Sequence, residues 1–161
     1  MKPSIQATSL HAAYGSLSVL QDVSFSVPKG EFFIVIGPNG SGKTTLLKIL
    51  SAITPFKRGN LEIAGLPMAK YSRRSLAKIM ALVPQTVPED LPFTVRELIL
   101  MARTPRMGLL GLEGDLDIRI AEEAMAFTRV ESLAERKMDQ LSGGERQRVF
   151  IARAICQEPQ I

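Results

Sequence analysis

A glycine-rich segment between residues 37 and 44 constrains the fold more than any other part of this sequence. It runs Gly-Pro-Asn-Gly-Ser-Gly-Lys-Thr and matches the phosphate-loop pattern G-x-x-x-x-G-K-[S/T]. At average glycine usage, a random chain of this length shows the pattern on the order of once in 100 or less. In such a loop, consecutive backbone N–H groups turn inward around a phosphate, and the positive end of the following helix points at it. The segment therefore predicts a site for a phosphorylated ligand.

The residues on either side of the loop fit this prediction. Before the loop, Phe32–Ile36 is a continuous apolar run, which is typical of a parallel strand buried on both faces. After the loop, residues 44–50 have helical spacing, and we expect Leu46, Leu47 and Leu50 on one side of that helix. The motif requires a strand, a glycine loop and a helix in this order.

Individual residues of the loop have defined chemistry. The three glycines permit the unusual backbone geometry and a close approach to phosphate oxygens. We expect the Lys43 ammonium between the β- and γ-phosphates of a nucleotide, and the Thr44 hydroxyl can ligate Mg²⁺. Thr45 could contact the α-phosphate or merely continue the helix, and both interpretations remain open.

Composition bounds the class of protein. The 161 residues suffice for one domain, and 45% apolar and 22% charged residues are ordinary for a globular chain. No apolar run approaches the roughly 18–20 residues of a membrane span, and the start leads into no signal-peptide core. The net charge of +4 comes without a basic run, so bound phosphates explain it and nucleic acid is not expected. The single cysteine, Cys156, excludes an internal disulfide, and we expect it to be buried on a helix.

The remaining sequence predicts a β-rich part followed by a helical part. Apolar alternation and apolar runs indicate strands at residues 5–14, 23–27, 59–65 and 79–83. Capping and helical spacing indicate helices at residues 94–102, 116–127, 131–136 and 142–157. We expect one domain over residues 1–161, with a β-rich nucleotide-binding part at 1–87 and a helical subdomain at 88–161.

The helix starts carry specific signals. Thr94 with Glu97, and Ser142 with Glu145, match the capping-box pattern. Asp115 is expected to cap the helix at 116–127. In that helix, four apolar residues fall at helical spacing and are expected on one face. They are Leu116, Ile120, Ala124 and Phe127.

The last helix opens with a second notable motif, Leu-Ser-Gly-Gly-Glu at residues 141–145. Ser142 would cap a helix whose N-terminus is exposed through Gly143 and Gly144, which gives a second anion site. Capping alone needs only Ser142 and Glu145 and leaves both glycines unexplained, since a glycine in a helix costs up to about 1 kcal/mol. From the residues alone, anion binding and plain capping both remain open.

With these two motifs in this order, the chain resembles ATP-binding-cassette (ABC) ATPases along its whole length. The resemblance implies the α/β fold of a P-loop NTPase of the ABC ATPase type, with an antiparallel β region, a helical subdomain and an incomplete core sheet. Two segments, Arg103–Gly111 and Asp139–Arg148, look most similar to importers for iron–siderophore, haem and cobalamin-like compounds.

The resemblance also implies roles for particular residues. Tyr14 lies where the family stacks an aromatic residue on adenine, although an ordinary strand-end tyrosine is the alternative. Gln85 matches the glutamine that touches Mg²⁺ or the attacking water and relays to the membrane partner. Ser142–Gly144 would complete the nucleotide site of a second subunit.

The implied site residues form three groups. The candidates for binding ATP are Tyr14, Gly37, Pro38, Asn39, Gly40, Ser41, Gly42, Lys43, Thr44 and Thr45. The candidate catalytic residues are Lys43, Gln85, Ser142, Gly143 and Gly144. The candidate Mg²⁺ ligands are Thr44 and Gln85.

The end of the sequence departs from the family pattern. Beyond the position of Ile161 the family continues into an apolar strand ending in a magnesium-binding aspartate, then a catalytic glutamate and a switch histidine. Asp22, Glu31 and Glu62 stand in the wrong context to replace these carboxylates, and His11 stands too early to be the switch histidine. We therefore expect a piece covering about the first two-thirds of such a domain. We expect it to leave apolar faces uncovered and not to hydrolyse ATP alone.

The resemblance implies the ATP-binding subunit of a transporter that couples ATP hydrolysis to import of a metal-chelate type substrate. Its expected partners are integral membrane permease subunits, a second copy of the ATPase in a head-to-tail dimer, and a substrate-binding protein. The expected location is cytoplasmic, peripheral on the inner face of the cell membrane.

Two other functions stay open. One is a soluble ABC ATPase in DNA repair or translation; such chains carry long coiled-coil or tandem-cassette insertions, and none separates Gln85 from the 141–145 motif. The other is a nucleotide-binding module without hydrolysis.

Overall fold

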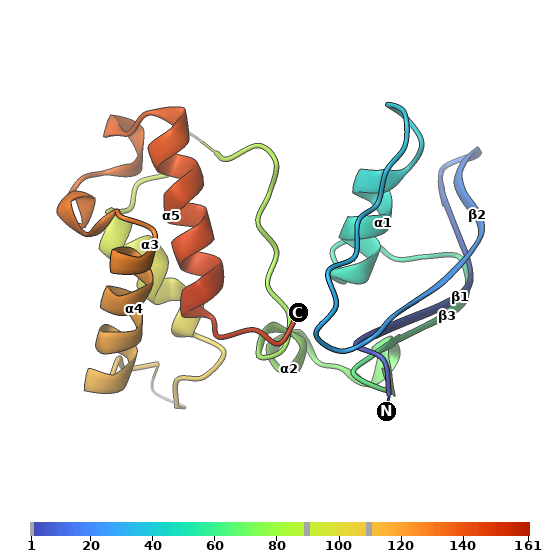
Figure 1. Cartoon of the computed structure of the whole chain (residues 1–161), viewed down its shortest axis with the longest axis horizontal. Coiled ribbons are helices and arrows are strands. Elements are labelled where there is room, and N and C mark those ends of the chain that lie inside the picture. The colour runs from blue at the N-terminus through green and yellow to red at the C-terminus, as the bar shows by residue number, and fades with distance from the viewer. Residues whose placement is uncertain (1, 89–90, 109–110) are drawn as a thin grey trace. The chain divides into compact units, whose positions relative to one another are not determined.

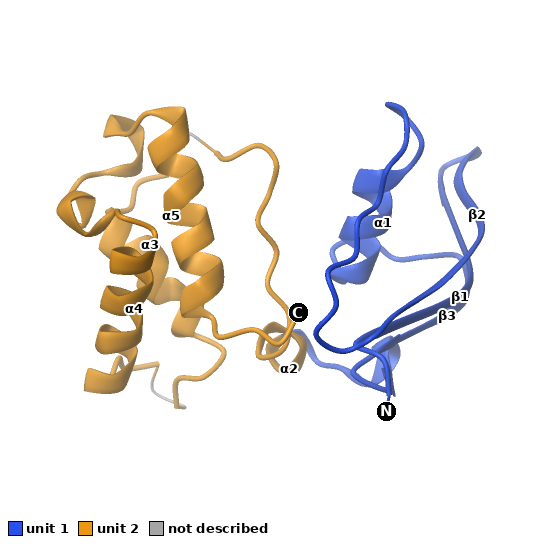
Figure 2. Ribbon diagram, viewed as in Figure 1, with its two compact units in different colours: residues 1–73 blue, residues 74–161 orange. Residues whose placement is uncertain are grey.

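The computed structural model describes residues 2–88, 91–108 and 111–161. The chain divides into two compact units, which we call unit 1 (residues 1–73) and unit 2 (residues 74–161) (Figure 2). The stretch from residue 74 to 87, which the sequence analysis assigned to the β-rich part, therefore belongs to unit 2.

Unit 1 contains a four-stranded antiparallel sheet with the order β2-β1-β3-β4 (Figure 1). Its strands are β1 (Ile5–Tyr14), β2 (Leu17–Val27), β3 (Arg58–Ile63) and β4 (Leu66–Pro67). The register of β1 and β2 runs from Ile5 opposite Val27 to Tyr14 opposite Leu17, so the two strands form a long hairpin. The expected antiparallel region is confirmed, and β2 begins earlier than the pattern at 23–27 indicated.

The core of unit 1 lies between this sheet and helix α1 (Lys43–Leu50), which Figure 1 shows beside it. Ile5, Ala7, Leu10 and Ala12 of β1 are buried, and the alternation shifts between Ala7 and Leu10, where the pairing register with β2 also shifts. The helix buries Leu46, Ile49 and Leu50. Leu47 is 46% exposed, so the expectation that it shares the buried side is wrong. Successive helical residues are about 100° apart, which turns Leu47 away from Leu46.

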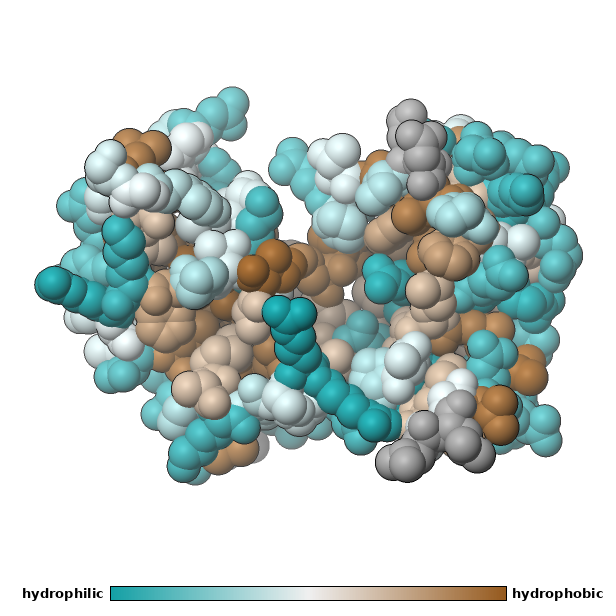
Figure 3. Space-filling model, turned by 180° about the vertical axis from the view of Figure 1, so that it is seen from behind, coloured by the Kyte–Doolittle hydropathy of each residue, from teal (hydrophilic) through white to brown (hydrophobic). Residues whose placement is uncertain are grey.

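The apolar run Phe32–Ile36 forms no strand, which corrects the sequence analysis. Phe32 is 90% exposed and Ile36 is 87% exposed. Phe33 contacts the sheet by stacking on Phe25, with 5.3 Å between the ring centroids. A strand needs hydrogen-bonding partners, and none of the strands in the described residues pairs with this segment. Figure 3 shows apolar side chains at the surface of both units.

Unit 2 is helical. Its three main helices are α3 (Val95–Leu100), α4 (Asp115–Phe127) and α5 (Gly143–Cys156). They bury a continuous apolar core that includes Ile99, Met125 and Val149. The shorter elements are α2 (Arg73–Ala77), which begins at the unit boundary, and the 3₁₀ turns η2 (Met101–Arg103), η3 (Glu131–Leu133) and η4 (Met138–Gln140). A further 3₁₀ turn, η1 (Met68–Lys70), lies in unit 1.

The helix starts agree with the sequence in two of three cases. The capping boxes of Thr94 with Glu97 on α3, and Ser142 with Glu145 on α5, are confirmed. The prediction that Asp115 caps α4 is wrong, because Asp115 is the first helical residue and Gly114 is the N-cap. The Asp117 carboxylate accepts a hydrogen bond from the Gly114 N–H at 3.2 Å and so acts in its place.

Two further expectations in unit 2 need correction. On α4 the buried residues are Ala121, Ala124 and Met125, whereas Leu116 and Phe127 are exposed, with Phe127 at 78%. The expected strand at 79–83 is absent from the described secondary structure. Its backbone instead pairs with the last residue, because Ala81 N–H donates to the Ile161 carbonyl and Ile161 N–H donates to the Ile79 carbonyl.

The single cysteine and the hydrophobicity of the helices can also be compared with the sequence. Cys156 is fully buried on α5, and this burial raises the pKa of its thiol to about 11. Among the described residues, no helix combines the length and the apolar character that a membrane crossing requires. Leu109 and Leu110 of the importer-like segment lie outside the described residues.

Candidate nucleotide-binding site

The phosphate loop of unit 1 is shaped by two glycines in the left-handed region. Gly40 has φ 81° and Gly42 has φ 90°, conformations that side chains of L-residues rarely adopt. A Cβ atom on Gly42 would also lie 2.8 Å from Leu20 Cδ2 and 3.0 Å from the Val19 carbonyl oxygen. Gly42 therefore allows both the turn and the close packing of the loop on β2.

The lysine of the loop folds back onto the start of the loop. Lys43 Nζ donates to the carbonyl oxygens of Gly37 and Pro38, each at 2.7 Å. Ser41 N–H donates to the same Pro38 carbonyl at 3.3 Å. These bonds hold the ammonium against the loop rather than in solvent, so its charge is placed where a phosphate bound by the loop would lie.

Helix α1 presents an open N-terminus to the loop. Its N-cap is Gly42, which offers no side-chain oxygen to the first-turn N–H groups, and the first turn contains no acidic residue. The first bond along the helix runs from Leu46 N–H to the Gly42 carbonyl, so the preceding N–H groups have no partner within the helix. Free N–H groups and a positive helix end are what an anion requires.

The two threonines after Lys43 differ in exposure. Thr44 is exposed, so its hydroxyl is accessible to a ligand. Thr45 is buried in the core of unit 1. Tyr14 ends β1 and is 50% exposed, beside the turn at Gly15. The loop, Thr44 and Tyr14 thus belong to the same unit.

Unit 2 carries the remaining candidate residues. Ser142 caps α5: its Oγ accepts from Glu145 N–H at 3.3 Å, and Glu145 Oε2 accepts from Ser142 N–H at 2.8 Å. The bonds from the Ser142 side chain and backbone lower the pKa of the Glu145 carboxyl. Gln85 is exposed, in a stretch without regular structure.

The glycines of the 141–145 motif stand in open space. A Cβ atom on Gly143 or Gly144 would meet nothing within 4 Å, apart from the helix's own backbone and chain neighbours, and neither has a positive φ. Nothing in the described chain requires glycine at these two positions, in contrast to Gly42. They are instead suited to a close approach by a group from outside the chain.

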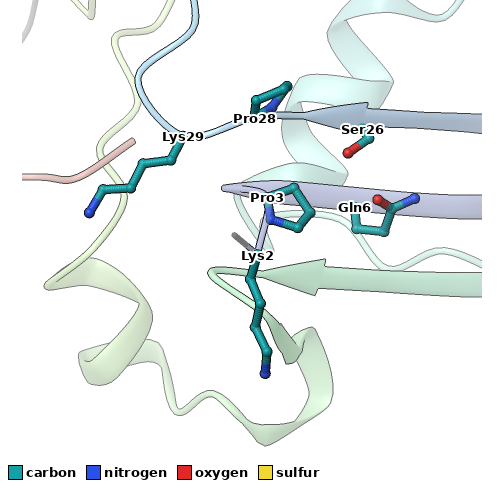
Figure 4. Close-up of a pocket in the computed structure, with 6 residues that line it drawn as sticks. All are labelled: Lys2, Pro3, Gln6, Ser26, Pro28 and Lys29. Atoms are coloured by element: carbon teal, nitrogen blue, oxygen red, sulfur yellow. The ribbon is translucent and has the colours of Figure 1, made fainter.

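In the described residues, neither clustered metal-ligand side chains nor the surface hollow provides a further ligand site. Among residues 2–88, 91–108 and 111–161, no group of three or more His, Cys, Asp or Glu side chains could hold a metal ion. A hollow of about 270 Å³ lies at the ends of β1 and β2 (Figure 4). It is lined by Lys2, Pro3, Gln6, Ser26, Pro28 and Lys29. The ammonium groups of Lys2 and Lys29 extend away from each other, and Lys2 Nζ donates to the Gly65 carbonyl at 3.4 Å. These lysines therefore form no common anion site.

Sequence reasoning missed one group of residues in unit 2. Arg103 and Arg106 were noted only as part of the importer-like segment, but their guanidinium groups bind the chain at the end of α5. The available signal was weak, because an arginine beside Thr, Pro and Gly residues does not reveal a partner more than 50 positions away.

Comparison with known proteins agrees with this geometry. The family model described as ABC transporter matches residues 20–161. The chain is 41% identical over 158 residues to the hemin import ATP-binding protein HmuV of Thermobifida fusca, covering 96% of this chain and 54% of that protein. It is 39% identical over 154 residues to the iron(3+)-hydroxamate import ATP-binding protein FhuC of Bacillus subtilis, covering 96% and 57%. A solved ATP-binding subunit of an ABC transporter superposes with a TM-score of 0.82 at 27% identity, covering 96% of this chain and 62% of that one.

The fold and the phosphate loop are those of a P-loop NTPase, and the chain belongs to the ABC transporter family. It spans about half the length of the curated relatives described above.

Proposed function

We propose that this protein binds ATP together with Mg²⁺ and acts as the ATP-hydrolysing subunit of an ABC importer for a metal-chelate type compound, such as haem or an iron–siderophore. The observation that carries the proposal is the open N-terminus of α1, with Lys43 folded against the loop and no first-turn carboxylate. This arrangement favours a polyphosphate over a neutral ligand.

The proposed roles follow from the placement of each group in unit 1. The N–H groups at the start of α1 bind phosphate oxygens, and Lys43 exchanges its bonds to Gly37 and Pro38 for bonds to the β- and γ-phosphates. The exposed Thr44 hydroxyl would be a ligand of Mg²⁺, which would spread the negative charge of the phosphate oxygens when bound. Gln85, which the family resemblance implies as a second Mg²⁺ ligand, belongs to unit 2. Tyr14, half exposed at the end of β1, stacks on the adenine.

The 141–145 motif is proposed to act on the nucleotide of a second copy. Gly143 and Gly144 leave open space at a capped helix start, which suits the close approach of phosphates from another subunit. Unit 1 already provides one phosphate loop, so a second phosphate site in the same chain fits a head-to-tail dimer. Ser142 supplies the cap, and its hydroxyl, which donates to Glu145 Oε2 at 2.7 Å, would exchange this bond for one to the incoming phosphate.

The cargo and the partners are proposed from the relatives. Two similar proteins are named for hemin import and iron(3+)-hydroxamate import. We therefore propose permease subunits in the membrane, a substrate-binding protein, and a location at the inner face of the cell membrane. The soluble alternative, an ABC ATPase of DNA repair or translation, is not favoured by relatives named as import proteins.

Removing the Lys43 ammonium tests the nucleotide site. Lys43→Ala should weaken Mg-ATP binding by about 10- to 100-fold, because charge-assisted hydrogen bonds to the phosphates are lost. Isothermal titration of wild type and variant with Mg-ATP measures this change. Lys48→Ala, near the other end of the same helix, is the matched control and should bind as wild type. Equal affinity of Lys43→Ala and Lys48→Ala would refute the phosphate-loop assignment.

A further inference from the structure

The end of α5 is held by guanidinium groups from the segment after α3. Arg103 Nη1 donates to the Cys156 carbonyl at 2.8 Å. Arg106 donates through Nε to the Gln157 carbonyl at 3.2 Å and through Nη2 to the Glu158 carbonyl at 2.8 Å. The last carbonyls of a helix have no partners within it, and their negative end favours a cation. Two arginines therefore bind three successive carbonyls at the exit of α5; we call this pair the arginine clamp.

The same clamp holds a strained turn. Glu158 has φ 50°, a left-handed conformation that is unfavourable for a residue with a side chain, and it precedes Pro159, which restricts it further. Its carboxylate lies 2.7 Å from Arg103 Nη1 and 3.8 Å from Arg106 Nε. Such a conformation persists only where the surroundings fix it. The ion pairs provide that constraint.

Arg103 anchors the clamp inside the helical unit, whereas Arg106 is partly exposed. Arg103 is only 3% exposed, and its Nε donates to Asp117 Oδ1 at 2.9 Å, in the first turn of α4. A buried guanidinium without carboxylate partners is costly, so Asp117 and Glu158 together fix where Arg103 lies. The position of the end of α5 is thereby set by α4.

The clamp also reaches the segment that leads to Gln85. Arg106 Nη2 donates to the Lys78 carbonyl at 3.1 Å, and Gln157 Nε2 donates to the Met80 carbonyl at 2.6 Å. Just after the turn, Ile161 N–H donates to the Ile79 carbonyl at 2.9 Å, and Ala81 N–H donates to the Ile161 carbonyl at 3.0 Å. The exit of α5 and residues 78–81 are thus joined by side-chain and backbone bonds.

We infer that Arg103 and Arg106 are positioning residues that fix the end of α5 against residues 78–81, and so couple the placement of Ser142–Gly144 to that of Gln85. The inference rests on the proposed function, in which both groups act on bound nucleotide. Because α5 is a continuous helix from Gly143 to Cys156, holding its last turn sets the direction of its first turn. Neither arginine needs to touch the nucleotide.

Arg106→Ala in the whole protein, assembled with its partners, tests the clamp. Arg106 is partly exposed, so the variant should fold. We expect kcat for ATP to fall by about 3- to 10-fold with KM and Mg-ATP affinity unchanged, because residues that couple two sites without touching the ligand have effects of this size. Hydrogen exchange should increase in peptides covering both 77–85 and 157–161. Gln157→Ala, a second variant that removes only side-chain bonds to residues 77 and 80, should change kcat in the same direction.

Arg96→Ala is the matched control. Arg96 also forms ion pairs in unit 2, with Glu122 at 3.5 Å and Glu135 at 2.9 Å, but it does not bind residues 156–158 in any described contact. The Arg96→Ala substitution should leave kcat unchanged, and hydrogen exchange in the peptides covering 77–85 and 157–161 should also be unchanged. Two results would overturn the inference. One is an equal fall in kcat for Arg96→Ala. The other is an Arg106→Ala variant that loses affinity for the nucleotide while its kcat is unchanged.

The experiment separates the inference from the proposed function. A wild-type protein that neither binds nor hydrolyses ATP refutes the proposed function, whereas the exchange measurement still tests the clamp. In that case, increased exchange at 157–161 with no change at 77–85 shows that the two segments are not coupled. Wild-type kcat in Arg106→Ala and Gln157→Ala, with normal hydrolysis by the parent protein, overturns the inference alone.

Discussion

The phosphate loop of unit 1 is held by residues next to it in the sequence, whereas the start of α5 in unit 2 is oriented from the far end of the helix. In the loop, the bonds of Lys43 span five or six residues, to Pro38 and Gly37. At the end of α5, the bonds of Arg103 span 53 and 55 residues. The glycines differ in the same way, since Gly42 is required by its own chain and Gly144 is not. We therefore expect the phosphate loop to be disturbed mainly by changes in its own backbone. The start of α5 should be disturbed mainly by changes in side chains far away in the sequence.

Substituting the glycine that packs on β2 should have the largest effect on stability. Gly42→Ala combines a positive φ with a Cβ atom 2.8 Å from Leu20 Cδ2, and we expect a loss of about 2–4 kcal/mol in the free energy of unfolding of unit 1. Denaturant unfolding followed by a probe in unit 1 measures this loss, and Mg-ATP binding should fall with it.

Gly30→Ala is the matched control for backbone strain alone. Gly30 has φ 80°, but a Cβ atom there meets nothing within 4 Å. We expect a loss of about 1–2 kcal/mol, the cost of the left-handed conformation. Equal losses in the two variants would show that packing against β2 does not require Gly42.

The corresponding substitution at the start of α5 should have a smaller effect of opposite sign. Gly144→Ala places a methyl group in open space on a helix, so the free energy of unfolding of unit 2 should rise by about 0.5–1 kcal/mol. Under the proposed function, hydrolysis by the dimer should fall while Mg-ATP binding by the phosphate loop stays unchanged. A destabilised Gly144→Ala variant would contradict the view that nothing within the chain needs this glycine.

The smallest expected effect is a dependence on pH at the clamp. Hydrogen bonds from Arg103, then from the Gly114 N–H, lower the pKa of Asp117 below its ordinary value near 3.8. The ionised carboxylate is therefore favoured in the folded state, and its stabilisation is present above about pH 5 and lost as the pH falls below about 4.

The difference in unfolding free energy between wild type and Asp117→Asn should follow this course, being constant near neutral pH and shrinking in acid. Asp139→Asn, at an exposed position in the same unit, is the control. A difference between wild type and Asp117→Asn that grows as the pH falls below 4 would contradict the assigned direction.

What the sequence could predict follows the same division between local and distant contacts. The capping boxes at Thr94 and Ser142 depend on contacts between residues three positions apart, and the structure has them as expected. Strand β1 is also confirmed, although it pairs with β3 far away in the sequence, because its apolar pattern marks a strand whatever its partner is. The strand predicted at Phe32–Ile36 is wrong. Apolar composition indicates that a segment can be buried, but it does not show that a partner strand pairs with it.

Other predictions failed because the spacing of apolar residues does not show which side of a helix its neighbours cover. On α4, periodicity selected Leu116 and Phe127, but the neighbouring helices cover Ala121 and Met125. The arginine clamp could not be predicted at all, since its bonds join residues 103–106 to 156–158. Only the folded backbone brings these segments together.

The burial of Cys156 gives unit 2 a natural chemical reporter. Alkylating reagents react with the thiolate, and a thiol with a pKa of about 11, fully covered by the helical core, offers almost none at pH 8. It reacts only when the helices around it separate. Because it is the single cysteine in the chain, and its carbonyl is the one that Arg103 binds, its rate of labelling measures how often the end of α5 opens.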